Sequence, residues 1–71
     1  MKNPQNPEEW QEAVDAAEAM LLLDSARQYG LITGGPGVHV DRCLEVLAAG
    51  RDRGIVPRPD AIERVLFELM K

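Results

Sequence analysis

The stretch VDRCLEVL, residues 40–47, has a counterpart in IERVLFEL, residues 62–69. Both follow one pattern: a β-branched residue, an acid, an arginine, a small apolar residue, a leucine, two variable positions and a second leucine. A glycine followed by two apolar residues precedes each stretch, at Gly30 and at Gly54. In both stretches apolar residues recur with the i, i+3, i+4, i+7 spacing of one helix face. The repeat therefore predicts two similar loop–helix units that dock on the segment before them.

Capping signals predict where the helices begin and end. Asn6 precedes Pro7 and two acidic residues, which is a typical helix start, and Gly30 can adopt the left-handed conformation that ends a helix. We therefore predict an all-α fold, a small three-helix domain whose second and third helices pack on the first. Its helices are expected at about residues 6–29, 39–53 and 59–70.

Two details of these helices stay open. The third helix begins either after Arg58, with Pro59 in its first turn, or after Asp60, with Glu63 as its capping partner. Gly50 lies inside the second helix, where glycine costs about 1 kcal/mol relative to alanine. Either a close helix crossing or fraying of the helix end would account for this glycine.

Size and composition indicate one domain. The chain has 71 residues, a length near the lower limit for a core without a metal, disulfide or partner. Of these residues 45% are hydrophobic and 28% are charged. The single cysteine allows no intrachain disulfide and is typical of the reducing cytoplasm. No apolar run is long enough for a signal peptide or a membrane span. We expect a cytoplasmic protein with a flexible segment at residues 1–5 and a single helical domain at residues 6–71.

The first helix carries two apolar stripes. One of them begins at Trp10, and the other lies on roughly the opposite side. Either the other two helices cover both stripes, or the second stripe meets a partner, most simply a second copy of the chain. Burying a leucine side chain contributes about 2 kcal/mol, so the stripe is not expected to stay in water. We therefore favour a homodimer, and the predicted partner interface is Ala19, Leu22, Leu23, Ala26 and Tyr29.

The distribution of charge bears on the kind of partner. The net charge is −4, and all of it falls in residues 1–37, because residues 38–71 hold six basic and six acidic side chains. An acidic first half suits a basic protein partner. The one concentration of basic residues is Arg51, Arg53 and Arg58, less than the basic face of a typical duplex-DNA binder. Nucleic-acid binding through these three arginines is therefore an alternative that the charge does not favour.

Residues 30–37 form a Gly-rich loop with four glycines. Such loops can turn backbone N–H groups toward a phosphate at a helix N-terminus. The specific parts of a phosphate-binding loop are missing, since no Gly-Lys-Ser/Thr sequence closes it and no basic residue lies between Arg27 and Arg42. We expect a connector with a type II turn at Pro36-Gly37 and keep anion or small-molecule binding as an alternative.

His39 and Cys43 are four residues apart, a spacing that suits two metal ligands or a Cys–His pair. No further ligand lies nearby in the sequence. Cys43 also falls in the apolar stripe of the second helix, where cysteine packs as a small hydrophobic residue. We therefore predict neither a metal ion nor another cofactor.

Among the charged residues, Asp24 interrupts an apolar line of the first helix, with Arg27 and Gln28 in reach at i+3 and i+4. Arg42 and Arg64 occupy equivalent positions in the repeat. We expect these two arginines to pair with acids of the first helix, with phosphate contact as the alternative. The acids concerned are Glu12, Asp15 and Glu18.

No set of side chains in the sequence is recognisable as a nucleophile with its acid and base. We therefore expect that the protein is not an enzyme. The function predicted is that of a small helical interaction or regulatory module, homodimeric through its first helix, that binds another protein.

Overall fold

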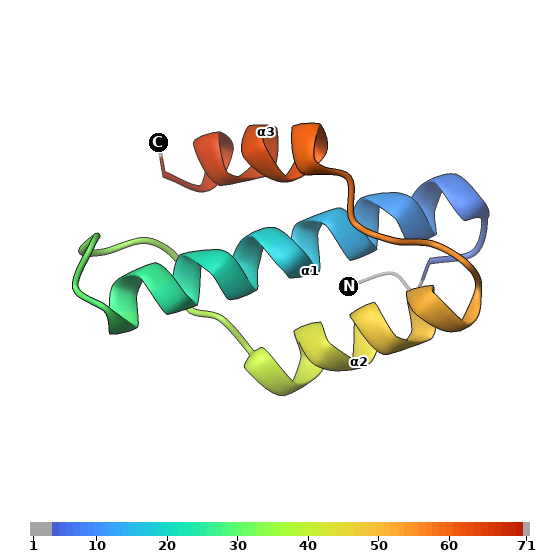
Figure 1. The fold of residues 1–71 in the computed structure, drawn as a ribbon, viewed down its shortest axis with the longest axis horizontal. Coiled ribbons are helices and arrows are strands. Elements are labelled where there is room, and N and C mark those ends of the chain that lie inside the picture. Colours follow the sequence, from blue (N-terminus) through green and yellow to red (C-terminus); the bar gives the residue numbers. More distant parts are fainter. Residues whose placement is uncertain (1–3, 71) are drawn as a thin grey trace.

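Three α-helices make up the computed structural model, which describes residues 4–70 (Figure 1). They are α1 (Pro7–Gln28), α2 (Val40–Asp52) and α3 (Pro59–Leu69), and the described residues contain no strand. The predicted all-α class is confirmed, and each predicted range agrees to within one residue at either end. Residues 1–3 of the predicted flexible segment, and residue 71 at the other end, lie outside the described residues.

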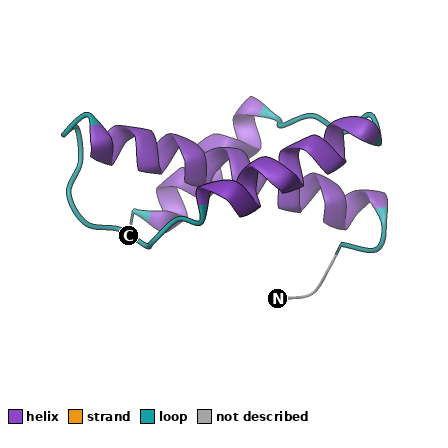
Figure 2. Cartoon of the chain, turned by 90° about the horizontal axis from the view of Figure 1, so that it is seen from below, coloured by secondary structure: helices purple, strands orange, loops and turns teal. Residues whose placement is uncertain are grey.

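The helix α1 lies between the other two. It packs against α2 on one side and against α3 on the other, while α2 and α3 make no contact with each other in residues 4–70 (Figures 1 and 2). α2 runs antiparallel to α1, and α3 runs parallel to it (Figure 1). The other two helices therefore pack on either side of α1, although Leu22 and Tyr29 of its second apolar stripe remain exposed. None of the helices within residues 4–70 combines the length and the apolar character needed to cross a membrane.

Local hydrogen bonds explain where α1 begins. The Glu9 N–H donates to Asn6 Oδ1 at 2.8 Å, and Glu9 Oε2 accepts from the Gln5 N–H at 2.7 Å, so side chain and backbone cap each other. For α3 the first of the two predicted starts is correct: Arg58 is the N-cap residue and Pro59 is the first residue of the helix.

Glycines in the left-handed region of φ end the first two helices. Gly30 after α1 has a φ of 75°, and Gly54 after α2 has a φ of 74°. The type II turn predicted at Pro36-Gly37 is wrong, because the positive φ angles occur earlier, 81° at Gly34 and 92° at Gly35. The physical reason is packing, because the loop turns where Gly35 lies next to the Leu23 side chain of α1.

The core is small and follows α1. Its buried apolar residues are Val14, Ala17, Ala19, Leu23, Cys43 and Ala61. Most of these side chains are short, which lets the helices approach closely. A Cβ atom placed on Gly50 of α2 would overlap Val14 Cγ2 of α1. A close helix crossing, rather than fraying, therefore explains Gly50.

Gly50→Ala is expected to lower the free energy of unfolding by about 1 kcal/mol. The new methyl group would overlap Val14 Cγ2, and overpacking costs about 1–3 kcal/mol, whereas the better helix propensity of alanine returns about 1 kcal/mol. Urea denaturation followed by circular dichroism measures the difference. In a Val14→Ala background the overlap is gone, so the same substitution should be neutral or stabilising. Equal destabilisation in both backgrounds would contradict the close crossing.

Candidate functional site

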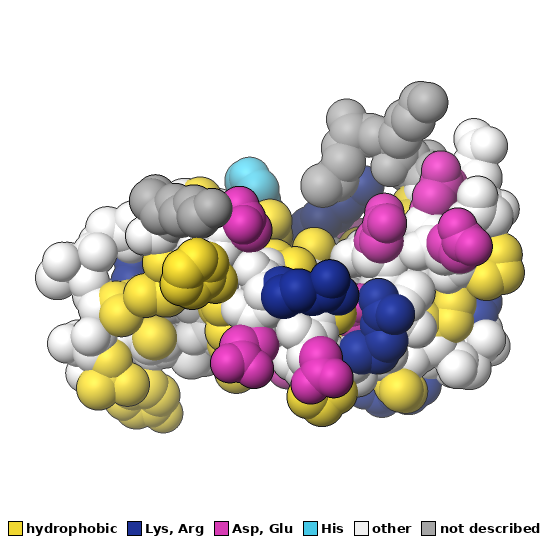
Figure 3. Space-filling model, turned by 90° about the horizontal axis from the view of Figure 1, so that it is seen from above, with side chains coloured by type: hydrophobic (Ala, Val, Ile, Leu, Met, Phe, Trp, Pro, Cys, Tyr) yellow, Lys and Arg dark blue, Asp and Glu magenta, His cyan; other side chains and the backbone are white. Residues whose placement is uncertain are grey.

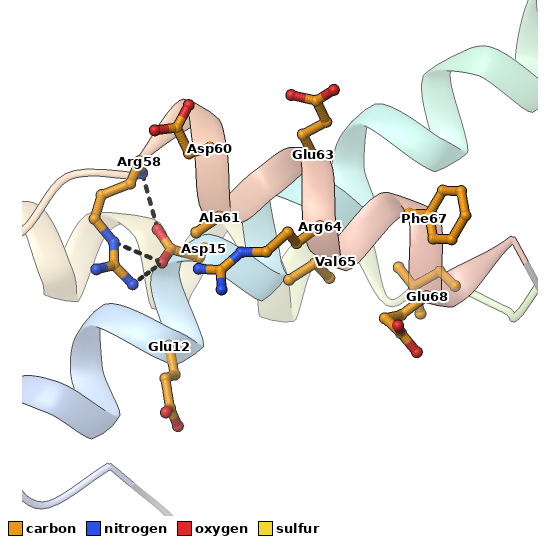
Figure 4. Close-up of a pocket in the computed structure, with 11 residues that line it drawn as sticks. Glu12, Asp15, Arg58, Asp60, Ala61, Glu63, Arg64, Val65, Phe67 and Glu68 are labelled. Atoms are coloured by element: carbon orange, nitrogen blue, oxygen red, sulfur yellow. Dashed lines mark hydrogen bonds and ion pairs between the residues drawn. The ribbon is translucent and has the colours of Figure 1, made fainter.

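Asp15 is the buried charged residue of the described chain, and it lies where α1 meets the start of α3 (Figure 4). Its carboxylate accepts hydrogen bonds from the Arg58 backbone N–H at 2.9 Å, from Arg58 Nε at 3.1 Å and Nη2 at 2.9 Å, and from Gln11 Nε2 at 3.0 Å. Gln11 Nε2 also donates to the Val56 carbonyl oxygen at 2.7 Å. These bonds fasten the linker between α2 and α3 onto α1.

Opposing effects set the pKa of the Asp15 carboxyl. Burial raises the pKa, because a poorly solvated site disfavours the charged form. The hydrogen bonds from the Arg58 backbone, the Arg58 side chain and Gln11, together with attraction to the guanidinium, lower it and outweigh burial. The pKa therefore lies below the ordinary value of 3.8. An ionised carboxylate with four donors is an anchor of the fold, and it is not poised to exchange protons near neutral pH.

The ion pair of Asp15 differs from the one that the repeat predicts. Its partner is Arg58, and neither Arg42 nor Arg64 lies within ion-pair distance of an α1 acid in the described part of the chain. That prediction is therefore wrong. Arg58 is favoured because its backbone N–H and its side chain both reach the same carboxylate. A signal was present in the sequence, because Asp15 extends the second apolar stripe of α1 by one helical turn before Ala19.

An open groove runs between α1 and α3 from this ion pair (Figure 4). Ala61, Val65 and Leu69, which are buried or half-buried, form its apolar floor. Exposed acids stand at its rim. Figure 4 shows the side chain of Arg64 extending toward Asp15. The lining residues are Glu12, Asp15, Arg58, Asp60, Ala61, Glu63, Arg64, Val65, Phe67, Glu68 and Leu69. We call this feature the α1–α3 groove.

Of the residues that the sequence predicts as a partner interface, some are buried inside the chain and others are exposed. Ala19 and Leu23 are buried in the core of the chain itself, so the expectation that they face a partner needs correction. The reason is that α3 and the Gly-rich loop cover this part of the stripe, with a Cβ at Gly35 falling 3.6 Å from Leu23 Cδ2. Ala26 is half-buried. Two residues of the stripe remain exposed, Leu22 at 45% and Tyr29 at 82%.

These exposed residues lie on a side of α1 that is only partly covered. Leu22 and Tyr29 follow Gln11 by eleven and eighteen residues, which places all three on the same side of the helix. The linker crosses this side at Gln11 through the hydrogen bond to Val56, and it leaves the C-terminal half open. On the antiparallel α2, Cys43 is buried against α1. Val40 and Leu44 lie about 60° and 100° further round that helix, so these two exposed side chains point to the same side as Leu22. We call this surface the Leu22 face: Leu22, Tyr29, Val40 and Leu44.

Arg51, Arg53 and Arg58, the arginines considered for nucleic-acid binding, lie in three different environments. Arg53 Cζ lies 4.1 Å from the centroid of the Trp10 ring, a cation–π contact between the end of α2 and the start of α1. Arg58 is paired with Asp15, and Arg51 is exposed. Arg53 and Arg58 therefore hold parts of the chain together, and of the three arginines only Arg58 has its charge neutralised by an acid within residues 4–70.

The Gly-rich loop presents carbonyl oxygens to the nearest basic residue. Arg27 Nη1 donates to the Gly34 and Gly35 oxygens at 3.4 Å and 3.3 Å. Arg27 Nη2 also lies 3.7 Å from Asp24 Oδ1, and Gln28 Nε2 donates to Asp24 Oδ2 at 2.7 Å, so Asp24 has the local partners that its spacing predicts. Arg27 thus stabilises the loop. Its guanidinium already contacts the Gly34 and Gly35 carbonyl oxygens and the Asp24 carboxylate.

His39 and Cys43 are differently exposed. His39 is the exposed N-cap residue of α2, whereas Cys43 is buried, and burial raises the pKa of its thiol. A raised pKa disfavours the thiolate that binds metals and acts as a nucleophile. Residues 4–70 contain no group of three or more His, Cys, Asp or Glu side chains arranged to hold a metal ion.

Comparisons of the chain with protein-family models, with curated proteins and with solved structures found no match. A function is therefore inferred from the groove, the Leu22 face and the charges around them.

Asp15→Ala is expected to lower the free energy of unfolding by about 2 kcal/mol at neutral pH. Breaking a buried ion pair costs about 3–5 kcal/mol, and the loss is smaller here because the Arg58 side chain is 55% exposed and can be hydrated. Urea denaturation provides the measurement. Asp24→Ala, which removes an acid with local partners on the same helix, is the matched control and should cost under about 1 kcal/mol.

The stability should also depend on pH through Asp15. Its pKa in the folded state is lower than in the unfolded chain, so the ionised form stabilises the fold above about pH 4, and this contribution is lost as the pH falls through the folded-state pKa. Between neutral and strongly acidic pH, the wild type should lose more unfolding free energy than Asp15→Asn, which cannot titrate. Parallel losses in the two proteins would show that Asp15 does not carry the effect.

Proposed function

We propose that this chain is a small, non-enzymatic helical module that binds other proteins in the cytoplasm, and that two copies associate through the Leu22 face. The observation that carries the proposal is the exposure of Leu22 on α1 and of Tyr29, its C-cap residue, on the helix that supplies most of the core. Contiguous apolar side chains that remain in water mark sites of association.

A second copy is the simplest occupant of the Leu22 face. A two-fold axis brings the same patch of each subunit together, so an apolar patch is complementary to itself. Full burial of Leu22 would contribute about 2 kcal/mol, and the aromatic ring of Tyr29 adds area while its hydroxyl can reach water at the rim. The net charge of −4 repels the remaining surfaces of two copies, which favours contact at an uncharged face.

The chemistry of the buried polar residues supports a binding role over a catalytic one. The Asp15 carboxylate is saturated with donors, and the Cys43 thiol has a pKa raised by burial. Neither group has the properties of a general base or a nucleophile. A single buried cysteine also suits the reducing cytoplasm, and the negative net charge favours protein over nucleic-acid partners.

Sedimentation equilibrium over a micromolar concentration range tests the dimer. The wild type should show twice the 7.9 kDa mass of one chain. Leu22→Glu places a charge in the contact and should raise the dissociation constant by at least about ten-fold, equal to 1.4 kcal/mol, with the helical circular dichroism unchanged. Tyr29→Ser should act in the same direction, and because Tyr29 is 82% exposed its replacement leaves the fold of the chain intact.

Phe67→Glu is the matched control for these variants. It puts the same charge on another exposed apolar residue, 69% exposed, that lies outside the half-buried stripe of α3 and away from the Leu22 face. A wild-type mass of 7.9 kDa at every concentration would overturn the dimer. Dissociation by Phe67→Glu as strong as that by Leu22→Glu would show that the contact lies elsewhere.

A further inference from the structure

The α1–α3 groove is long enough to contact two turns of a helix. Ala61, Val65 and Leu69 follow one another at intervals of four residues, so they form one apolar ridge along α3. Eight residues of helix span about 12 Å, or two turns, which matches the side chains at i, i+4 and i+7 of a docked amphipathic helix. The short side chain of Ala61 lies at the end of the groove beside Asp15 and Arg58.

The charge of the lining specifies the partner. Five acidic and two basic side chains line the groove, which gives it a net charge of −3. Asp15 and Arg58 neutralise each other, so the field at the rim comes from exposed acids such as Glu12 on α1 and Glu63 on α3. Figure 3, which views the molecule with α3 toward the reader, shows acidic side chains on both sides of a central basic pair and apolar side chains over one end. The groove thus combines apolar side chains with an excess of acidic ones, which complements apolar side chains flanked by lysine or arginine.

We propose that the α1–α3 groove binds a basic amphipathic helix of a partner protein. This inference rests on the proposed protein-binding function and names the chemical class of its partner. It does not require the dimer, because the groove and the Leu22 face consist of different residues. Of the two arginines in the lining, Arg58 is paired with Asp15 of α1, and Arg64 is paired with no acid of α1 within the described residues. The positive charge of Arg64 therefore repels a basic partner.

The probe is a fluorescein-labelled peptide of about 18 residues, five helical turns, with leucines on one face and lysines on the other. Fluorescence anisotropy should show saturable binding to the wild-type protein that weakens as salt is added. A peptide with glutamate in place of every lysine should bind at least about ten-fold more weakly, because the acidic rims repel it. Absence of binding by the lysine peptide, or equal binding by both peptides, overturns the proposal.

Matched charge variants locate the site. Glu63→Lys reverses a rim charge and should weaken binding several-fold, and Arg64→Gln should strengthen it. Glu45→Lys makes the same charge change on α2 outside the groove and should have a much smaller effect. All three side chains are exposed, so the fold does not depend on them. Equal weakening by Glu45→Lys and Glu63→Lys would mean that the peptide responds only to net charge, and the groove would be rejected.

The Leu22→Glu variant separates this proposal from the dimer. If Leu22→Glu is monomeric and still binds the lysine peptide, the groove acts as a site of its own. If the wild type is monomeric and binds the peptide, only the dimer is wrong. If the wild type is dimeric and does not bind, only the groove is wrong.

Discussion

The contact of α1 with both neighbours is the constraint on which the structure depends, because α2 and α3 do not meet within residues 4–70. A helix in that position needs two apolar faces, and α1 provides them with short side chains such as Ala17 and Ala19. Short side chains bring the helices close, as Gly50 against Val14 shows, but they bury little area. The helices therefore lie close together, but the apolar core between them is small.

Polar interactions supplement this limited core where α3 begins. Four hydrogen-bond donors converge on the two oxygens of Asp15, and three of them belong to Arg58. Three of these bonds come from the N-cap residue of α3, so the carboxylate ties the start of α3 to one position on α1. Gln11 strengthens this placement because it donates to the linker and to Asp15 at once. An apolar residue at position 15 would leave the position of α3 less well defined.

The helix ends and the packing of two helices on the first could be predicted from the sequence, whereas the individual contacts between distant side chains could not. Asn6 and Gly30 specify the ends of α1 through bonds and angles within a few residues. The partner of Asp15 lies 43 residues away, and the repeat, which treats Arg42 and Arg64 as equivalent, carries no information about Arg58. Periodicity likewise reveals the faces of α1 but not which segment covers each face.

Two surfaces remain available on this small chain. α1 has 22 residues, about 33 Å, whereas α2 has 13 and α3 has 11, so neither covers its full length. The Leu22 face stays open because the linker crosses α1 at Gln11 and leaves the C-terminal half of that helix uncovered, and the groove lies where α3 packs beside α1. Surrounding negative charge limits indiscriminate association of such surfaces, because like-charged molecules repel and basic ones are attracted. A chain with this geometry is too small to bury all of its own apolar residues, and its negative charge lies around those that stay exposed.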